Sequence, residues 1–225
     1  MKKYLEFVAV SVFLFSCADT ERDNQYDERA DNYIGNICSD FVGGTEREHY
    51  GKMKKQFCDE RDGKKYVYTT IGTQIWMAEN LNYNVASSKC YGNKDENCVT
   101  YGRLYNWDTA KKVCPTGWHL PSKDEWKAMT AYIGGADTEG KKLKAKSGWN
   151  NNGNGTDDYG FSALPSGGGY SGGYSYVGEH SDWWSASENE DYSLAYSRYI
   201  YYDQDYAGWW ENDKSSLFPI RCVKD

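Results

Sequence analysis

The sequence has little of what several common classes of protein require. Basic residues are in the minority, with 26 Lys and Arg against 33 Asp and Glu, so the formal net charge is −7. A surface of this sign repels a phosphate backbone, which argues against a nucleic-acid partner. No two cysteines have the C-x-x-C spacing of zinc and redox sites, so a metal cluster of that kind is not expected. The four prolines form no proline-rich linker.

The N-terminus has the layout of an export signal. Two lysines precede a short apolar stretch that ends in "LFSC", whose last residue is Cys17. This pattern predicts a signal peptide over residues 1–16, and its resemblance to a bacterial lipobox predicts that Cys17 carries lipid. The apolar stretch is too short to remain as a membrane-spanning helix. We expect a lipid-anchored protein of the outer membrane, at the cell surface. The alternative is an ordinary secreted protein that is cleaved a few residues further on.

The other six cysteines are predicted to form disulfides. An even number of cysteines in an exported chain indicates a disulfide framework, and six cysteines allow fifteen pairings. The simplest arrangement joins neighbours in the sequence and leaves the last two cysteines for each other: Cys38–Cys58, Cys90–Cys98 and Cys114–Cys222. Closing the last and longest loop would stabilise the fold by about 4–5 kcal/mol in the chain-entropy model.

The chain divides into a polar segment and a compact domain. From residue 18 to about residue 61 the sequence is rich in acidic residues and poor in apolar ones. Residues 17–61 are therefore predicted to be a flexible, lipid-anchored tether with a small loop closed by a disulfide. Asp62-Gly63 is a turn signal, and the compact domain is predicted over residues 62–225.

Short strands and two short helices are predicted within this domain. The sequence "KKYVYTTIGTQIWMAENLNY" predicts two strands around Gly72, and a short helix is expected near residues 108–113. Later strands are predicted in "DWWSASE", "AYSRYIYY" and "FPIRCV". The glycine-rich segment at residues 167–172 is expected to be a flexible loop, because no helix pattern follows it as a dinucleotide-binding loop would need.

The second helix has the clearest signals, and they lie in the stretch "CPTGWHLPSKDEW". Ser122 and Glu125 have the S-x-x-E spacing of a capping box, which predicts a helix from about residue 123 to residue 133. Gly134-Gly135 ends it. Its predicted buried face consists of Trp126, Met129 and Ile133, which follow at helical spacing.

Five motifs follow one another in the compact domain: "YTTIGTQIWMAENLNY", "YGRLYNWDTAKKVCPTGWHLPSKDEW", "GTDDYGFSALPSGG", "WWSASE" and "FPIRCV". Together, in this order, they resemble the Fibrobacter succinogenes major paralogous domain (FISUMP), and the resemblance covers roughly residues 62–225. More distantly, "WDTAKKVCPTGWHLPSKDEW" resembles the first-helix region of C-type-lectin-like domains. "HLPSKDEW" and "RCV" are similar to motifs of the formylglycine-generating enzymes, which use a related fold.

The resemblance implies an α+β fold: a C-type-lectin-like domain with short strands, two helices and long loops. In the lectin-like pattern the cysteine after the first helix bonds to one near the end of the domain, which implies the same Cys114–Cys222 pair. Formylglycine-generating enzymes need free active-site cysteines. Because every cysteine of the domain has a plausible partner here, that oxidase activity is not expected.

His119 and Cys114 are the only candidates for a base beside a nucleophile. A cysteine held in a disulfide cannot be a nucleophile, so a structural role is expected for His119. No Ser/His/Asp arrangement has a recognisable nucleophile turn. We therefore expect a protein that is not an enzyme.

The polar loop "NNNGNGTDD" is the candidate metal site. Its spacing imitates the start of an EF-hand loop, but the twelfth position is Phe161, so the bidentate glutamate is missing. Some lectin-like folds bind calcium in their long loops, and a structural calcium is a candidate cofactor here; a solvated turn is the alternative. The candidate ligands are Asn154, Asp157 and Asp158. No other cofactor is expected.

Aromatic residues gather in the last third of the chain. Residues 159–210 hold 15 of them, whereas aromatic residues make up 16% of the whole sequence. Many adjoin Gly, Asp, Ser or Asn, which suits a site where rings stack on the C–H faces of sugars and polar groups bind the hydroxyls. Ordinary core and cross-strand packing is the alternative. The candidate binding residues are Trp183, Trp209, Trp210, Glu211 and Asp213, with the two adjacent tryptophans expected on a loop.

These observations favour a non-catalytic binding domain on a surface lipoprotein. The expected partners are the membrane, through the N-terminal lipid, and a plant polysaccharide or another surface molecule. A structural or protein–protein interaction module of the outer membrane is the alternative. An enzyme related to the formylglycine-generating family is the third and least favoured hypothesis.

Overall fold

The structure is a computed structural model and describes residue 38 and residues 45–49, 52–190 and 193–225. The predicted signal peptide and Cys17 lie outside the described residues. No helix among the described residues is long and apolar enough to cross a membrane. Strands predominate and the helices are short, so the fold is α+β, as predicted.

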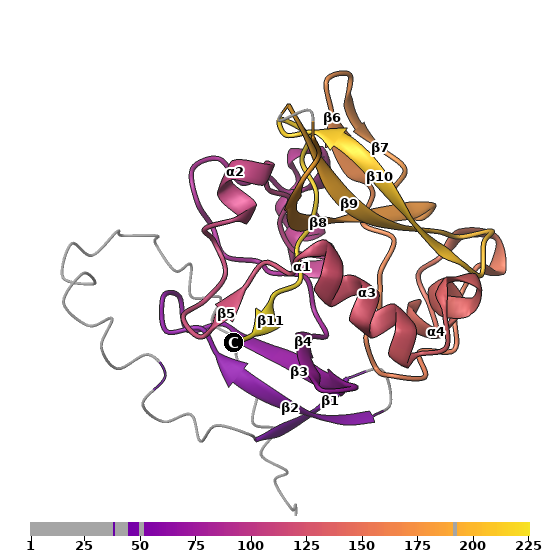
Figure 1. The fold of residues 1–225 in the computed structure, drawn as a ribbon. Coiled ribbons are helices and arrows are strands. Elements are labelled where there is room, and N and C mark those ends of the chain that lie inside the picture. Colours follow the sequence, from indigo (N-terminus) through magenta and orange to yellow (C-terminus); the bar gives the residue numbers. More distant parts are fainter. Residues whose placement is uncertain (1–37, 39–44, 50–51, 191–192) are drawn as a thin grey trace, which may run out of the picture.

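Six strands form the larger sheet, in the spatial order β1-β2-β3-β4-β11-β5 (Figure 1). The two strands predicted around Gly72 are β3 and β4, which form an antiparallel hairpin. Gly72 has a φ of 63°, a conformation that glycine adopts without strain. Of the predicted strand "FPIRCV", only the short β11 forms, and it pairs antiparallel with both β4 and β5. The strands span Glu46–His49 (β1), Lys52–Cys58 (β2), Lys65–Ile71 (β3), Gln74–Met77 (β4), Trp118–His119 (β5) and Val223–Lys224 (β11).

β1 and β2 lie within the segment that was expected to be a flexible tether. They pair with each other, and β2 pairs with β3, so the sheet begins before residue 62. The polar composition of this segment gives no sign of a strand. One of the lysines of β2 is nevertheless buried and hydrogen-bonded. The Lys54 ammonium donates to the backbone oxygen of Gly160 at 2.6 Å and to Oγ of Ser162 at 3.0 Å. Part of the predicted tether therefore belongs to the sheet.

The remaining strands of the described residues form two smaller sheets. The three-stranded sheet has the order β10-β9-β8 and is antiparallel throughout. The glycine-rich segment that was predicted to be a flexible loop forms the two-stranded hairpin β6–β7, which Figure 1 shows near β10. The strands span Gly168–Tyr170 (β6), Gly173–Ser175 (β7), His180–Glu188 (β8), Leu194–Tyr201 (β9) and Ala207–Asp213 (β10).

The described residues form four short α-helices where two were predicted: Asp95–Tyr101 (α1), Trp107–Ala110 (α2), Lys123–Tyr132 (α3) and Glu139–Leu143 (α4). The capping box of α3 is confirmed, with the Ser122 side chain accepting from the backbone N–H of Glu125 and the Glu125 side chain accepting from that of Ser122. α2 matches the helix expected near residue 108, although it is shorter. Single-turn 3-10 helices lie at Tyr91–Asn93, Ala136–Thr138 and Asn150–Asn152.

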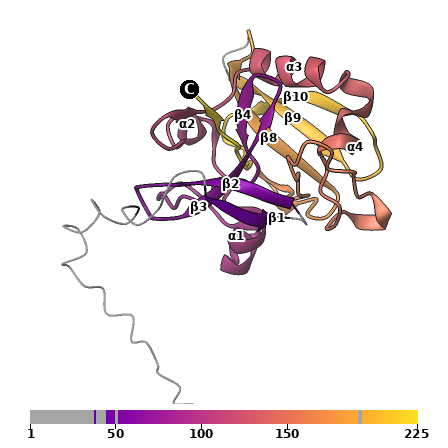
Figure 2. The same cartoon turned by 90° about the horizontal axis from the view of Figure 1, so that it is seen from below.

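The β8–β9–β10 sheet lies between two apolar cores. Trp183 belongs to the core that contains Trp126 and Met129 of α3, and Figure 2 shows α3 running along this sheet. Trp184 belongs to the other core, with Tyr105 and Phe218. Adjacent residues of a strand point to opposite faces, so the "WW" pair supplies one large ring to each core.

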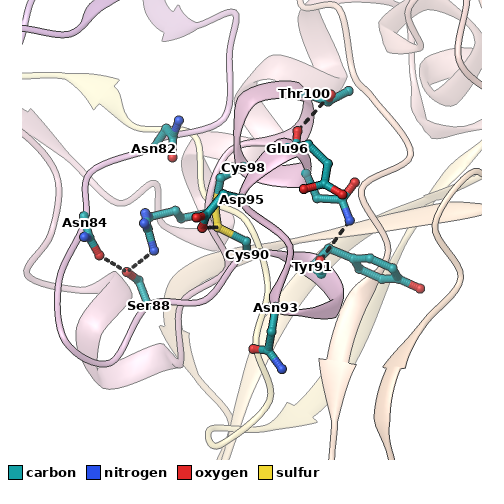
Figure 3. The surroundings of a disulfide bond; sticks show 12 residues. Asn82, Asn84, Ser88, Cys90, Tyr91, Asn93, Asp95, Glu96, Cys98 and Thr100 are labelled. Atoms are coloured by element: carbon teal, nitrogen blue, oxygen red, sulfur yellow. Dashed lines mark hydrogen bonds between the residues drawn. A yellow bond between two sulfur atoms is a disulfide. The ribbon is translucent and has the colours of Figure 1, made fainter. Parts of the chain in front are cut away.

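The three predicted disulfides are confirmed: Cys38–Cys58, Cys90–Cys98 and Cys114–Cys222. The last one joins the segment after α2 to the residue before β11, across a sequence separation of 108. The middle one ties Cys90 to α1 (Figure 3).

Candidate functional site

One face of the β8–β9–β10 sheet carries polar and aromatic side chains beside its core residues. His180 pairs with Tyr201 across β8 and β9, and Trp210 pairs with Ser197 across β9 and β10. Cross-strand partners and every second residue along a strand point the same way. The same face therefore collects His180, Asp182, Ser197, Tyr199, Tyr201, Trp210 and Asn212.

The rings on this face contact one another. The Tyr199 ring lies 5.2 Å from that of Trp210, 5.5 Å from that of Tyr201 and 6.5 Å from that of Tyr206, measured between centroids. Gly208 makes this arrangement possible, because a Cβ there would lie 2.2 Å from Cζ of Tyr199. The Tyr199 ring can thus lie against the backbone of β10.

The contacts continue toward the β6–β7 hairpin. The His180 ring stacks on that of Tyr201 at 4.7 Å, and Tyr176 lies 4.9 Å from His180. Tyr170 follows at 6.0 Å from Tyr176. We call this continuous set the aromatic row: Tyr206, Tyr199, Trp210, Tyr201, His180, Tyr176 and Tyr170.

Tyr176 has an uncommon backbone conformation. Its φ is 73°, in the left-handed region that residues other than glycine seldom adopt. Its carbonyl oxygen accepts hydrogen bonds from the backbone N–H groups of Glu179 and His180, at 3.0 and 3.1 Å. The ring nevertheless remains half exposed. Strained residues often occur at binding sites, so the placement of this exposed ring marks the hairpin side of the row as a candidate site.

A cavity of about 280 Å³ lies within the row, next to the hairpin. Its size is just below the range of ordinary ligand pockets, which measure roughly 300–1,000 Å³. Rings and polar groups alternate around it: Tyr170, Ser175, Tyr176, His180, Asp182, Tyr201, Trp210 and Asn212.

Asp182 is the centre of a buried polar network at this cavity. Its Oδ2 accepts from Nε2 of His180 at 2.7 Å and from the hydroxyl of Tyr170 at 3.3 Å. Its Oδ1 accepts from Oγ of Ser197 at 2.9 Å, and Asn212 donates to the same Oγ at 2.9 Å. Burial raises the pKa of Tyr170, and the charge of Asp182 raises it further, so this hydroxyl keeps its proton and donates.

The two ring nitrogens of His180 have different surroundings. Nε2 of His180 lies 2.7 Å from Oδ2 of Asp182. Nδ1 is buried and has no hydrogen-bond partner among the described residues. An unpaired buried polar atom is costly, and a bound group that formed a hydrogen bond with this nitrogen would remove that cost.

The Cys90–Cys98 disulfide supports the hairpin side of the cavity. Tyr91, next to Cys90, packs its ring against that of Tyr174 in β7 at 5.4 Å. The Tyr174 hydroxyl donates to Oδ1 of Asn93 at 2.8 Å. Figure 3 shows Tyr91 and Asn93 close to the disulfide. Fixing this segment therefore also fixes the strand that precedes Tyr176.

Of the residues predicted to bind ligand, only Trp210 lines the cavity, and it is 49% exposed. Trp183 is fully buried and its Nε1 donates to Oδ1 of Asn80 at 2.9 Å, so it is a core residue. Trp209, Glu211 and Asp213 alternate with Trp210 along β10 and therefore lie on its opposite face. The expectation of a loop at residues 209 and 210 is wrong, because this segment pairs with β9.

The other cavity residues were missed in the sequence. The alternation in "YSRYIYY" and "HSDWW" places Tyr199 with Tyr201 and His180 with Asp182 on one face. That signal could have identified these four residues as neighbours, had the strand pairing been known. Tyr170 and Tyr176 could not be found in this way, because the hairpin that presents them was expected to be a loop.

Two of the three predicted calcium ligands use their side-chain oxygens in hydrogen bonds within the protein. Oδ1 of Asn154 accepts from the backbone N–H of Trp149 at 3.1 Å. Asp157 is buried, and its two oxygens accept from the backbone N–H and the hydroxyl of Ser162 at 2.7 and 2.8 Å. Asp158 is exposed. Across the described ranges, no group of three or more His, Cys, Asp or Glu residues is placed to hold a metal ion.

His119 has a structural position. Its Nδ1 is 2.6 Å from Oδ1 of Asp225, and its Nε2 is 2.6 Å from Oε1 of Glu125. Burial lowers the pKa of His119, but the hydrogen bonds to Asp225 and Glu125 outweigh it, so the pKa is raised. His119 thus connects β5 to the first turn of α3, and Cys114 is held in its disulfide with Cys222.

Comparison with known proteins identifies the family. Residues 69–224 match the model of the Fibrobacter succinogenes major domain, and the chain belongs to this family. The family resemblance seen in the sequence is thereby confirmed. No curated protein and no solved structure matches the chain.

Proposed function

We propose that the domain binds polysaccharide through the aromatic row and is not an enzyme. One observation carries this proposal. Among the described residues, five large apolar side chains are exposed, and three of them, Tyr176, Tyr206 and Trp210, belong to the row. Exposed apolar groups that gather in one place indicate a binding surface.

The chemistry of the row suits sugars. Flat rings can stack on the apolar C–H faces of a sugar, and the exposed Trp210 and Tyr176 offer such rings on either side of the cavity. Asn212, Ser175 and the His180–Asp182 pair supply hydrogen-bonding groups between them. A few placed polar groups within an aromatic lining are typical of small-molecule sites.

The chain is proposed to be a lipoprotein, anchored in the outer membrane through lipid on Cys17 and facing the cell surface. A C-type-lectin-like arrangement is proposed for the domain on the basis of its motifs and the Cys114–Cys222 disulfide. All six cysteines from Cys38 to Cys222 are paired, which supports a role without a reactive thiol. Replacing Cys17 with serine should release the protein from the membrane fraction and abolish labelling by a fatty-acid analogue; unchanged partition and labelling would contradict the anchor.

Retention on insoluble cellulose and xylan, together with a glycan array, tests the binding function. Trp210→Ala and Tyr176→Ala should each weaken binding about 30-fold, since anchoring residues commonly contribute 2 kcal/mol or more. Tyr132→Ala is the matched control, because Tyr132 is 61% exposed but lies on α3, away from the row.

Two outcomes would overturn the proposal. One is the absence of binding to every glycan tested, in which case the row would be a protein-docking surface. The other is that the two variants of the row bind as the wild type does. Thermal unfolding of each variant shows whether a loss of binding reflects a loss of folding.

A further inference from the structure

We infer that the aromatic row takes a single, solvated polysaccharide chain and does not bind the flat face of a crystalline polysaccharide. The inference rests on the proposed function and concerns the physical form of its ligand. It follows from the angles between the rings, from the hollow among them and from the polar groups in that hollow.

The rings do not lie in one plane. The plane of the Tyr199 ring is inclined by 31° to that of Trp210, by 73° to that of Tyr201 and by 74° to that of Tyr206. Dispersion contact weakens greatly over a gap of about 0.5–1 Å. A rigid plane that lay flat on one of these rings would therefore lose contact with the next ring. A flexible chain can turn from one ring to the next.

Near the hairpin the rings surround a hollow. Tyr176 is inclined by 56° to His180 and by 83° to Tyr170. All three line the cavity of about 280 Å³. A hollow of this size and lining can admit part of one chain. A crystal face, which is continuous in two dimensions, could only pass over it.

Nδ1 of His180, which lines the hollow and has no hydrogen-bond partner among the described residues, suits a ligand whose hydroxyls are free to form hydrogen bonds. The carboxylate of Asp182 and the amide of Asn212 both reach Oγ of Ser197, and both residues line the cavity. Chains packed in a crystal hydrogen-bond their edges to neighbouring chains. A solvated chain exchanges hydrogen bonds to water for hydrogen bonds to these residues, which costs little.

The test compares crystalline cellulose with two solvated polysaccharides, swollen cellulose and soluble xylan. Binding isotherms would be measured on microcrystalline and on acid-swollen cellulose, normalised to accessible area, and soluble xylan would be titrated calorimetrically. We expect the tighter of the swollen cellulose and soluble xylan affinities to exceed that for the crystalline form by tenfold or more. An affinity for the crystalline form within tenfold of that value would overturn the inference. The absence of binding to all three probes and to the glycan array would overturn the proposed function instead.

Variants test whether the aromatic row causes the preference for a solvated polysaccharide. Trp210→Ala and Tyr176→Ala should each lose binding to swollen cellulose and soluble xylan, whereas Tyr132→Ala should keep it. If Trp210→Ala also lowers the melting temperature, the result for Tyr176→Ala decides whether the row binds the chain. Half of the Tyr176 side chain is exposed, so its removal should disturb folding little. Unchanged binding by a folded Tyr176→Ala variant would contradict the assignment of the hollow as the chain's site.

Discussion

Trp183 and Trp184 are adjacent in the chain, yet their rings belong to different cores and each indole N–H has its own acceptor. Nε1 of Trp183 donates to Oδ1 of Asn80 at 2.9 Å, and Nε1 of Trp184 donates to the backbone oxygen of Tyr105 at 2.8 Å. Both side chains are fully buried. β8 therefore supplies one large buried ring to each core. The binding face depends on β8 being held in place by these two rings.

Trp184→Ala should strongly destabilise the domain. Removing a fully buried ring leaves a cavity, and large-to-small changes of this kind cost about 3–5 kcal/mol. Denaturant unfolding monitored by circular dichroism would measure the loss. Trp210→Ala is the control and should cost much less, because its ring is half exposed. Equal stabilities for these two variants would contradict the assigned burial.

Gly208→Ala should weaken polysaccharide binding through Tyr199. The added Cβ would lie 2.2 Å from Cζ of that ring, so the ring must move and the row is distorted. Such overpacking commonly costs about 1–3 kcal/mol of stability. Adding Tyr199→Ala should restore the stability but not the binding, a coupling that a double-mutant cycle measures. If Gly208→Ala binds normally, the position of Tyr199 does not matter for the ligand.

Replacing both Cys90 and Cys98 with serine should impair binding more than folding. The disulfide closes only a short loop, so the loss of stability should be modest. Tyr91 and Asn93, however, would no longer hold Tyr174 firmly, and the hairpin beside the cavity would loosen. Hydrogen exchange at residues 168–176 should rise, and affinity for xylan should fall. A variant with unchanged exchange would show that the hairpin is rigid without this support.

The pair formed by His119 and Glu125 should make stability depend on pH. The folded pKa of His119 is raised above its ordinary value of about 6.5. The contribution of His119 to the free energy of unfolding is therefore complete below pH 6.5 and is lost as the pH rises through the folded pKa. The pKa of Glu125 is lowered, against the effect of burial, by hydrogen bonds from Ser122 and His119. Its contribution is complete above its ordinary pKa and is lost as the pH falls.

Unfolding of the wild type and of His119→Gln, measured from pH 5 to pH 9, would test this dependence. The wild type should lose stability relative to the variant as the pH rises above about 6.5. The effect should be small, because His119 is 41% exposed and water screens the pair. Parallel pH profiles for the two proteins would contradict the assigned hydrogen bonds.

The sequence predicted those parts of the fold that depend on local signals. α3 was found because Ser122 and Glu125 lie three residues apart, and the β3–β4 hairpin because Gly72 allows its turn. The disulfides followed from the spacing of the cysteines. By contrast, β2 lies in a segment whose polar composition predicts a tether, whereas its Lys54 is buried among distant oxygens of residues 160 and 162.

The candidate site depends on strand register, which the sequence does not state. "AGWWEND" lacks the alternation of a half-buried strand, and its pairing with β9 alone decides that Trp210 faces the cavity and Trp209 does not. The hairpin that carries Tyr170 and ends next to Tyr176 is built largely from glycines and was taken for a loop. The aromatic composition therefore indicated the right region, but only the fold selects its residues.

The position of β11 has a consequence for how fast the domain can fold. Val223 pairs with Trp76 on one side and with His119 on the other, so β11 joins β5 to the rest of the large sheet. Contacts between residues so far apart in the chain are slow to form, because the closure entropy is lost before the contacts stabilise anything. Closing the large sheet around β11 is therefore expected to be a slow step in the folding of this domain.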